Sequence, residues 1–500
     1  MLKEYQIDAE TFKTLETRKP GKARLHVTGA LALTQISVLD SIDGRALGAG
    51  LILLWQPTIG RAGQFCVRKT KTGERLVVLP LKTPPQTLGD LPATLLGGAL
   101  HDALDGRALI CLHHLKVQLK TMNLVVKNQT IADAVCALEG DGKRAWMWVD
   151  PRKGFENAAS SALKPIGNAK AKMPAFSGVL DHASKAAQLN SKGFPTLTAS
   201  QPAAQAIQLL HETLLAQMTS QVDGTCKDLD IEFLHDLRVA SRRARSLLQT
   251  VKTVLSEEAQ AYGIERYRWL GQETTALRDL DVYLYDYPAL QEALSPEMRI
   301  ALEPFRLLLE TERKRAFSRV KTVLKSRAFS QFAQSWGDKL AADESYQGKD
   351  AGQPIGAIAA KAIWKRYGRI CADGQAITDD TPAEALHDLR KQGKKLRYLL
   401  EFFASLYPAA QIKPRIGSLK KLQDLLGAYQ DCAVQAAFLE DKAAKLRKDV
   451  SVPAETLMAM GALADQRLQD EKRLRRDFQA FFKPFASAPE RAGYKGMLNL

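Results

Sequence analysis

A pattern of histidine and basic residues occurs twice in the second half of this chain, 152 positions apart. One copy opens with His235-Asp236-Leu237-Arg238 and the other with His387-Asp388-Leu389-Arg390. Basic residues follow each histidine by 3, 7, 8 and 10 positions, and an aspartate follows it by 44 positions. A spacing preserved over that length predicts two copies of one structural unit.

Each copy gathers its cations on one face of a helix. At 100° per residue, Arg238, Arg242 and Arg245 fall within an arc of about 80° beside His235, with apolar residues opposite. Like charges on one helix face repel one another, so either distant carboxylates or an external polyanion must neutralise them. An unused surface has no reason to keep residue type and spacing in two diverged copies. The pattern therefore favours an anion-binding site.

Further residues complete the predicted site. Asp279 and Asp431 are expected to orient the basic side chains through charge-assisted hydrogen bonds. The two histidines either contact the ligand or orient their helices, and the sequence leaves both interpretations open. No catalytic residue is expected. The predicted anion-binding residues are His235, Arg238, Arg242, Arg243, Arg245, His387, Arg390, Lys394, Lys395, Arg397, Arg268, Lys420, Lys361 and Lys365.

The overall charge agrees with an anionic partner. The 500 residues include 71 Lys and Arg against 55 Asp and Glu, a formal net charge of +16, and such an excess points to a polyanion. Residues 201–500 alone carry 45 basic and 39 acidic residues. The cations of that half must therefore be sorted onto particular faces if they are to bind anything.

Other features narrow the class of protein. No run of 18 apolar residues is present, which predicts no membrane span and no membrane partner. The N-terminus lacks the apolar core of a signal peptide. Six cysteines are scattered without a CxxC pair, which is typical of reduced thiols in a cytoplasmic protein. We expect no metal and no cofactor, and the sequence indicates no oligomeric state.

Two kinds of periodicity divide the chain. Residues 1–163 alternate short apolar runs with turns, which predicts a mostly antiparallel sheet or barrel. From Gln205 onward the apolar spacing is helical, and Pro288, Pro354, Pro382 and Pro408 are expected between helices. The expected fold class is therefore α+β and multidomain. The predicted strands lie within residues 23–29, 32–41, 50–56, 75–81, 115–126 and 144–150, and the predicted four-helix units are residues 204–335 and 354–486.

The repeated segments resemble a known family. HDLRVASRRARSLL and HDLRKQGKKLRYLLEFF are similar to the signature helices of the CHAD domain, the conserved-histidine α-helical domain, as are LGQETTALRDLDVYL and LKKLQDLLGAYQDCAV. The resemblance covers residues 204–486. It implies two pseudo-symmetric four-helix bundles whose basic residues line a shared cavity or groove that binds inorganic polyphosphate. It also implies association with polyphosphate granules.

Residues 1–190 resemble a CYTH domain, the triphosphate tunnel fold, through the strand succession, KGFENAASSAL and Ser184–Gln188. An active tunnel enzyme needs ExExK on its first strand, where this chain reads Glu4-Tyr5-Gln6-Ile7-Asp8. With too few carboxylates for a divalent metal, we expect a degenerate domain without triphosphatase activity. The carboxylates of Asp40, Glu139 or Asp150 could supply part of the missing negative charge for such a metal. The domain is either a scaffold or keeps some anion affinity through Arg68, Lys69, Lys71, Lys82, Lys116 and Lys120.

Two rival interpretations remain. His211, His235, Asp236 and Asp279 can be arranged as the ligands of a metal-dependent phosphohydrolase, although the second copy has Ile363 in place of His211 and neighbouring arginines would repel a cation. A nucleic-acid-binding protein is the other rival, because duplexes also reward cationic tracks. The expected divisions are a CYTH-like domain at 1–190, a linker at 191–203, the CHAD domain at 204–486 and a C-terminal tail at 487–500.

Overall fold

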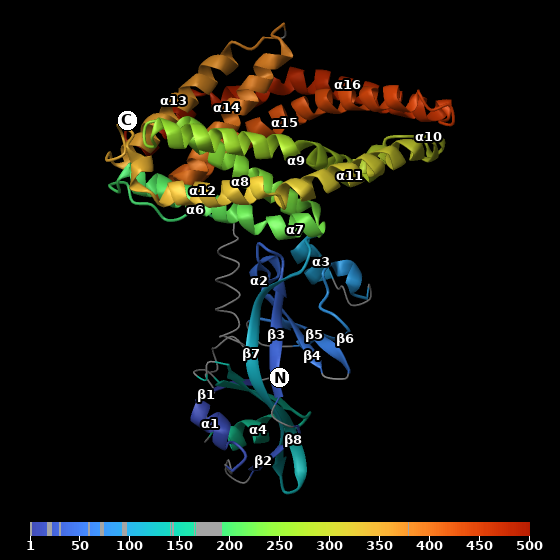
Figure 1. Ribbon diagram of the computed structural model, residues 1–500, viewed down its shortest axis with the longest axis vertical. Helices are drawn as coiled ribbons and strands as arrows, with labels where there is room; N and C mark the ends of the chain where they lie inside the picture. The colour runs from blue at the N-terminus through green and yellow to red at the C-terminus, as the bar shows by residue number, and fades with distance from the viewer. Residues whose placement is uncertain are drawn as a thin grey trace. The chain divides into compact units, whose positions relative to one another are not determined.

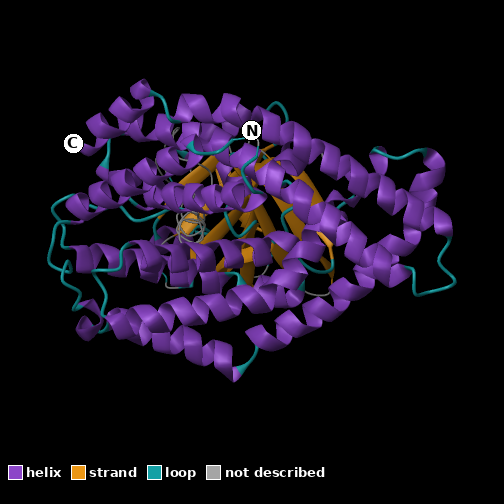
Figure 2. Ribbon diagram, turned by 90° about the horizontal axis from the view of Figure 1, so that it is seen from above, coloured by secondary structure: helices purple, strands orange, loops and turns teal. Residues whose placement is uncertain are grey.

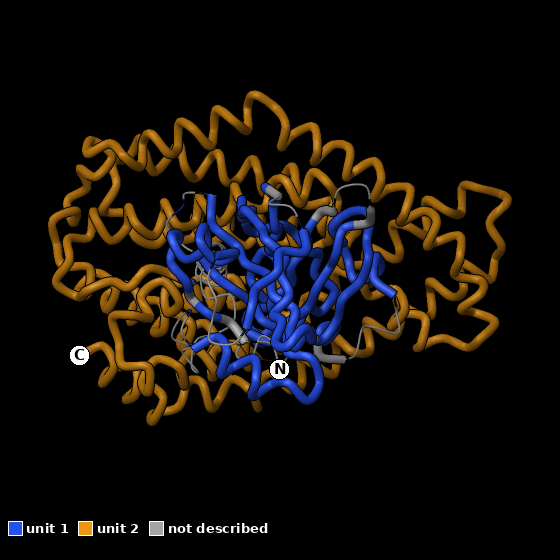
Figure 3. Tube along the Cα trace, turned by 90° about the horizontal axis from the view of Figure 1, so that it is seen from below, with its two compact units in different colours: residues 1–193 blue, residues 194–500 orange. Residues whose placement is uncertain are grey.

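The computed structural model divides into two compact units, residues 1–193 and 194–500 (Figure 3). None of the described helices combines the length and the apolar character that a membrane crossing requires. The predictions made for Lys71, Arg144 and Ser184–Gln188 lie outside the described residues. The structure describes the chain except for residues 1–2, 18–22, 30–31, 59–60, 71–74, 93–97, 141, 143–144, 165, 167–192 and 379.

The first unit is built on one antiparallel sheet with the strand order β1-β9-β8-β7-β3-β4-β5-β6, and β2 pairs with β7 (Figure 1). The 17-residue strand β7 organises it, because β2 and β3 pair along one edge and β8 pairs along the other. The expected antiparallel architecture is confirmed. The strands are β1 (Lys3–Ile7), β2 (Ala23–Val27), β3 (Ala32–Asp40), β4 (Leu51–Thr58), β5 (Arg61–Lys69), β6 (Arg75–Leu81), β7 (Ile110–Val126), β8 (Gln129–Glu139) and β9 (Ala145–Pro151).

The sheet curls into a half-barrel. Asp133 on β8 and Trp148 on β9 line the same cavity, of about 220 Å³, as Arg68 on β5 and Val78 on β6. Strands from opposite ends of the order therefore face one another. A separate apolar cluster seats two of the short helices against the sheet. These helices are α1 (Ala9–Thr14) and α4 (Glu156–Leu163), and the unit also contains α2 (Arg45–Gly48), η1 (Leu88–Asp90) and α3 (Gly98–Leu104).

The described elements of the second unit are all helical (Figure 2). The periodic apolar positions that predict these helices are buried in two clusters, a large one and a smaller one. The elements are α6 (Ala203–Ser220), α7 (Val222–Lys227), α8 (Ile231–Thr250), α9 (Glu257–Glu292), α10 (Pro296–Ala301), α11 (Glu303–Leu324), α12 (Arg327–Ala341), η3 (Asp343–Tyr346), α13 (Ile355–Gln375), α14 (Ala383–Phe402), η4 (Ala404–Leu406), α15 (Ala409–Leu446), α16 (Ala454–Phe485) and α17 (Ala488–Leu498).

The two sequence repeats have matching helix neighbours. Helix α8 packs on α6 and α9 in the first repeat, and α14 packs on α13 and α15 in the second. Helix α12 contacts α6 and α9, whereas α17 contacts α13 and α15, so α17 takes the place of α12 in the second repeat. Residues 487–500, which the sequence separates as a tail, thus contain a helix whose Tyr494, Met497 and Leu498 are buried.

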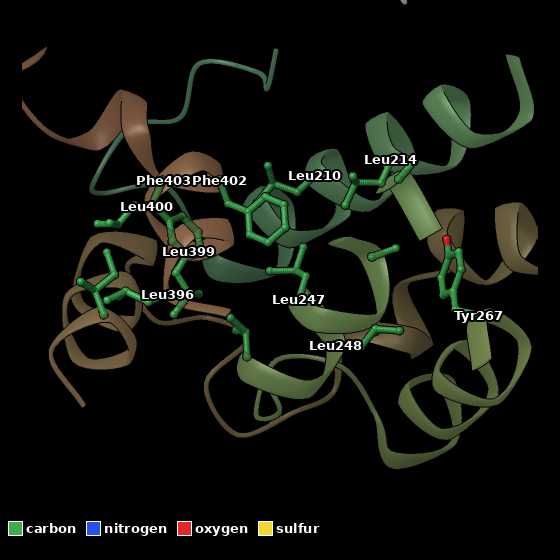
Figure 4. Close-up of a cluster of buried hydrophobic side chains, with 14 of the residues drawn as sticks. Leu210, Leu214, Leu247, Leu248, Tyr267, Leu396, Leu399, Leu400, Phe402 and Phe403 are labelled. Atoms are coloured by element: carbon green, nitrogen blue, oxygen red, sulfur yellow. The ribbon is translucent and has the colours of Figure 1, made fainter. Parts of the chain in front are cut away.

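The apolar faces of the repeated helices meet in one core. Leu247 and Leu248 on α8 are buried in the same cluster as their equivalents Leu399 and Leu400 on α14 (Figure 4). Burial of such side chains stabilises each helix by about 1.5–3 kcal/mol per leucine. Because this contact fixes the rotation of both helices, it also fixes where their basic stripes lie.

One expected helix boundary is wrong. Helix α9 continues through Pro288 to Glu292, although a proline removes one backbone donor and crowds the preceding turn. Tertiary packing compensates, because Tyr287 and Leu290 are buried in an apolar cluster and Tyr287 Oη donates to Leu302 O at 3.1 Å. Three other prolines precede helices as expected: Pro354 before α13, Pro382 before α14 and Pro408 before α15.

Candidate anion-binding site

Helix α8 is fixed at its start by a side-chain cap. Asp230 Oδ1 accepts hydrogen bonds from Glu232 N at 2.8 Å and Phe233 N at 3.1 Å, which satisfies two of the free amides of the first turn. Leu237 and Ala244 are fully buried on the apolar face. The cap and the buried face together hold the basic stripe of α8 in one orientation.

The first arginine of each stripe is anchored to the next long helix. Arg238 Nη1 donates to Gly271 O at 2.8 Å and Thr274 Oγ1 at 2.6 Å on α9. Its equivalent Arg390 lies on α14, where Nη2 is 3.3 Å from Asp431 Oδ1 on α15. Burial and the neighbouring cations lower the pKa of Arg238 to about 10. Because its acceptors on α9 are neutral, Arg238 keeps its net charge in the site.

Asp279 and Asp431 act on these arginines to different degrees. Asp431 makes the direct contact with Arg390. Asp279 influences Arg238 through its charge, while the hydrogen bonds of that guanidinium go to Gly271 and the adjacent threonines. Of the two predicted orienting carboxylates, the structure therefore places one in hydrogen-bond range of its arginine.

Arg242 and Lys394 hold the same position in the two repeats, and they are close enough for the charge of Arg242 to act on Lys394. Burial, together with the charges of Arg390 and Arg242, lowers the pKa of Lys394 to about 8. Arg242 Nε is buried without a hydrogen-bond acceptor from the protein. Among the described residues, neither Arg242 nor Lys394 has a carboxylate within 4 Å. The two stripes therefore approach each other where the repeats face one another, and Asp431, which also pairs with Arg390, acts on Lys394 through its charge.

Arg243 and Arg397 have a different environment. Arg243 Nη2 is 2.6 Å from Glu401 Oε2, and Arg397 Nε is 2.7 Å from Glu401 Oε1. The Arg243 side chain is only 9% exposed, and its guanidinium lies over the rings of Phe194 and Tyr398. These two predicted anion-binding residues are thus held by a carboxylate of the protein, and Arg243 is buried.

Lys395 and Arg245, the equivalents of Arg243 and Arg397, remain close together on the other side of the axis. Burial and the charges of Arg366 and Arg245 lower the pKa of Lys395. Lys395 lines a cavity of about 900 Å³ formed by α8, α9, α13, α14 and the connecting segments around residues 251–253 and 349–350. The end of this stripe therefore opens into a cavity between the two repeats.

The cavity is strongly cationic. Its acidic lining residues are Glu257 and Asp350. Arg268, Lys361 and Lys365 belong to the set predicted from the sequence, whereas Lys252 and Lys349 do not. The latter two lie on connections between helices, where no periodicity signals a shared face. The basic lining residues are Lys252, Arg268, Lys349, Lys361, Lys365, Arg366, Arg369 and Lys395.

The two signature histidines have different neighbours. His387 Nδ1 lies 2.7 Å from Gln430 Oε1, which ties α14 to α15. The ligand atoms of Glu232, His235 and Asp236 lie within 4.8 Å of one another, but Arg278 Nη1 is 3.5 Å from Glu232 Oε1 and would oppose a metal ion.

His211 belongs to the apolar core instead. It is fully buried, and its ring packs edge-on against Trp336 with centroids 5.7 Å apart. Burial lowers the pKa of His211 to about 3. Its environment is that of a neutral core side chain, so it does not join Glu232, His235 and Asp236 in a metal-ligand group.

Apart from the two histidines and Lys420, the predicted residues therefore fall into three groups. Arg242 and Lys394 meet at the centre, and Arg238 and Arg390 flank them. Arg243 and Arg397 pair with Glu401, while Lys420 lies exposed on α15 without a contact to either set among the described residues. The residues gathered at the cavity end of the stripes are Arg245, Arg268, Lys361, Lys365 and Lys395.

In the first unit, several candidate charges already have protein partners. The Asp40 carboxylate accepts hydrogen bonds from Ser41 N, Ala46 N and Leu47 N, and burial raises its pKa to about 6. Lys120 Nζ is 2.9 Å from Glu16 Oε1. These contacts give both groups a structural role.

The first-strand motif is only partly described. Asp8 lies outside β1, where its Oδ1 accepts from Thr11 N and caps α1. The side chains of Glu4 and Gln6 lie outside the described residues. Asp133, Asp150 and the buried Arg68 line the half-barrel cavity. Three more of the basic candidates, Lys69, Lys82 and Lys116, are exposed.

Comparisons with known proteins agree with this architecture. The CHAD domain family model matches residues 210–440. Two uncharacterized proteins from two strains of Mycobacterium tuberculosis are 24% identical over 265 residues, which is 52% of this chain and 49% of each relative. The chain thus spans about half the length of these curated relatives.

Two solved structures are also similar. The CHAD domain from the plant Ricinus communis is 21% identical with a TM-score of 0.48, covering 58% of this chain and 94% of that one. PptA from Streptomyces chartreusis is 17% identical with a TM-score of 0.44, covering 56% and 99%. The CHAD domain match at residues 210–440 thus falls within the helical unit, and the antiparallel half-barrel that precedes it is consistent with a CYTH-like domain.

Proposed function

We propose that the helical unit binds inorganic polyphosphate along the facing stripes of α8 and α14. The CHAD family is associated with polyphosphate binding. The observation that carries the proposal is that the charge of Arg242 acts on its equivalent Lys394, both side chains being half-buried and neither having a carboxylate within 4 Å among the described residues. Such an arrangement costs free energy in the free protein, and a bound polyanion would offset that cost.

Polyphosphate suits the chemistry of these side chains. It is a flexible chain with about one negative charge per phosphate. Guanidinium groups bind phosphate oxygens with two parallel hydrogen bonds, and lysines add adaptable point charges. A line of cations running from Arg238 through Arg242 and Lys394 to the cavity beside Lys395 supplies successive contacts for such a chain.

A nucleic-acid ligand is less well supported. Binding of single strands usually relies on exposed aromatic rings for base stacking. The aromatic residues beside the stripe, Phe194 and Tyr398, instead stack on the buried Arg243 guanidinium. A ligand that consists of phosphate alone needs no such rings, which favours polyphosphate.

Two further proposals follow from the family. We propose that the protein associates with polyphosphate granules, since a chain-binding surface would retain it there. We also propose that it does not hydrolyse triphosphates, because Asp40 and Asp8 are engaged as backbone caps. This leaves Asp133 and Asp150 as the acidic residues that line the half-barrel cavity.

A competition experiment tests the proposed ligand. Full-length protein is first incubated with fluorescent long-chain polyphosphate. Unlabelled polyphosphate, duplex DNA or heparin is then added as competitor, at concentrations matched by their total negative charge. Polyphosphate should displace the label at the lowest concentration. Preferential displacement by DNA would instead support the nucleic-acid interpretation.

A further inference from the structure

The two repeats differ at one equivalent position that controls the charge of the site. Glu401 on α14 accepts from Arg243 at 2.6 Å and from Arg397 at 2.7 Å. Its equivalent on α8, 152 positions earlier, is Gln249. A neutral amide cannot neutralise Lys395 and Arg245, which correspond to Arg243 and Arg397.

This difference coincides with a difference in structure. On the Glu401 side, Arg243 is 9% exposed and is covered by Phe194 and Tyr398, with its carbon Cζ 5.3 Å and 5.8 Å from the two ring centroids. On the opposite side, Gln249 and Lys395 both line the cavity of about 900 Å³. The repeats are therefore related in sequence, but one side is closed and paired whereas the other is open and cationic.

The surplus charge of the open side is large. Eight basic side chains and two carboxylates line the cavity. Among the described residues, Arg369 alone of the eight has a carboxylate within 4 Å, since its Nε is 3.5 Å from Asp373 Oδ2. Four of the five lysines are exposed, so their side chains can adjust to an anion without moving a helix.

We propose that the Gln249 cavity is a pocket for a short oligophosphate stretch, and that Gln249 keeps it able to bind while Glu401 closes the equivalent position. This proposal rests on the proposed function, because the cavity would bind part of the same phosphate ligand. The phosphate stretch is either a free oligophosphate or a segment of a longer chain whose remainder follows the stripes.

The test uses full-length protein and tripolyphosphate. Gln249→Glu restores at this position the carboxylate found in the other repeat and should raise the Kd for tripolyphosphate by about tenfold or more, since a like charge opposes the ligand at short range. Gln466→Glu is the matched control, because it makes the same change at an exposed position of α16 that does not line the cavity, and it should stay within about twofold of the parent.

A second variant and a folding control separate a loss of binding from a loss of structure. Arg268 lies on α9 and lines the same cavity, so Arg268→Glu should weaken tripolyphosphate binding to a similar extent. Thermal unfolding should show that both variants are folded. Unchanged tripolyphosphate binding in the folded Gln249→Glu variant would overturn the pocket. Parent protein that binds long chains but not tripolyphosphate would overturn it while leaving the proposed function intact. Failure of the parent protein to bind either ligand would overturn both the pocket and the proposed function.

Displacement distinguishes the two sources of the phosphate stretch. If tripolyphosphate displaces labelled long-chain polyphosphate from the parent but poorly from Gln249→Glu, the pocket holds a segment of the long chain. If both ligands bind together and Gln249→Glu affects tripolyphosphate alone, the pocket takes the free oligophosphate.

Discussion

The charge of Arg242 acts on Lys394, the residue that holds the same position in the other repeat. Only residues close to the axis relating two copies can lie near their equivalents, so this pair marks where the repeats face each other. Burial and neighbouring cations lower the pKa of Lys394 to about 8. Its protonation therefore reports on the charge of the whole interface.

Polyphosphate binding near pH 8 should be coupled to proton uptake at Lys394. The free ammonium is half deprotonated at that pH, and a bound anion favours the charged form and raises the pKa. Affinity should accordingly fall as the pH rises from 7 to 9. Calorimetry at pH 8 in two buffers with different ionisation enthalpies measures the uptake.

Lys394→Arg is the control for that measurement. Arginine keeps its charge throughout this pH range, so the variant should lose most of the proton uptake and of the change in affinity between pH 7 and 9. An unchanged pH dependence in Lys394→Arg would assign the titration to another group.

Both stripes should contribute to affinity. Arg242→Glu and Lys394→Glu each replace an attraction with a repulsion near the axis and should each raise the Kd for long-chain polyphosphate by about tenfold. The double variant should bind more weakly than either. Titration by fluorescence anisotropy measures the three constants.

Lys448→Glu provides a matched control with the same change of charge. Lys448 is exposed beyond the end of α15, about 20 Å or more along the helix axis from Asp431. The Kd of the Lys448→Glu variant for long-chain polyphosphate should differ from that of the parent by less than about threefold. A loss confined to Arg242→Glu, with Lys394→Glu unaffected, would contradict a site shared by both repeats.

Glu401→Gln should destabilise the helical unit. The substitution keeps the shape of the side chain but leaves Arg243 buried without its counter-ion, which costs about 2–4 kcal/mol in the free energy of unfolding. Urea denaturation followed by helical circular dichroism measures it. Glu303→Gln, which breaks an exposed pair with Arg306, should cost less than about 1 kcal/mol. Equal losses in the two variants would contradict the structural role of Glu401.

The general architecture could be predicted because it depends on local patterns. Helical spacing and the repeated charges identify the long helices and their basic faces. Strands β5 and β8 are not among the predicted ones, since β5 contains Gly63 and begins and ends with basic residues, whereas β8 is rich in alanine, and neither composition is typical of strands. Pro288 shows the same limit, because packing of its neighbours overrides its local preference.

Partner choice within the site depends on contacts that sequence spacing does not reveal. Arg243 and Arg245 carry the same charge on one helix, yet Arg243 pairs with Glu401, 158 positions away, whereas Arg245 lies next to other cations. Lys252 and Lys349 reach the cavity from connecting segments. Gln249 occupies the position that Glu401 holds in the other repeat. This difference points to a change in the charge of the site only when the structure shows that α8 and α14 are equivalent.

The N-terminal unit should not release phosphate from tripolyphosphate or ATP. Metal-assisted hydrolysis requires several carboxylates around one or two divalent ions, and Asp40 and Asp8 are engaged with backbone amides. Phosphate release is measured with Mg²⁺ or Mn²⁺ over a pH series. Metal-dependent turnover that disappears in Glu4→Gln would show that the domain is a working enzyme.

The most direct test of the central claim is a titration of residues 194–500 with long-chain polyphosphate over a series of salt concentrations. This segment keeps α17, whose Tyr494 is fully buried, and a fragment ending at residue 486 would lose that helix. We expect tight binding. The logarithm of the association constant should fall linearly with the logarithm of the salt concentration, with a slope of about −4 if six cations contact phosphates. Binding that is insensitive to salt, or that is found only with residues 1–193, would contradict it.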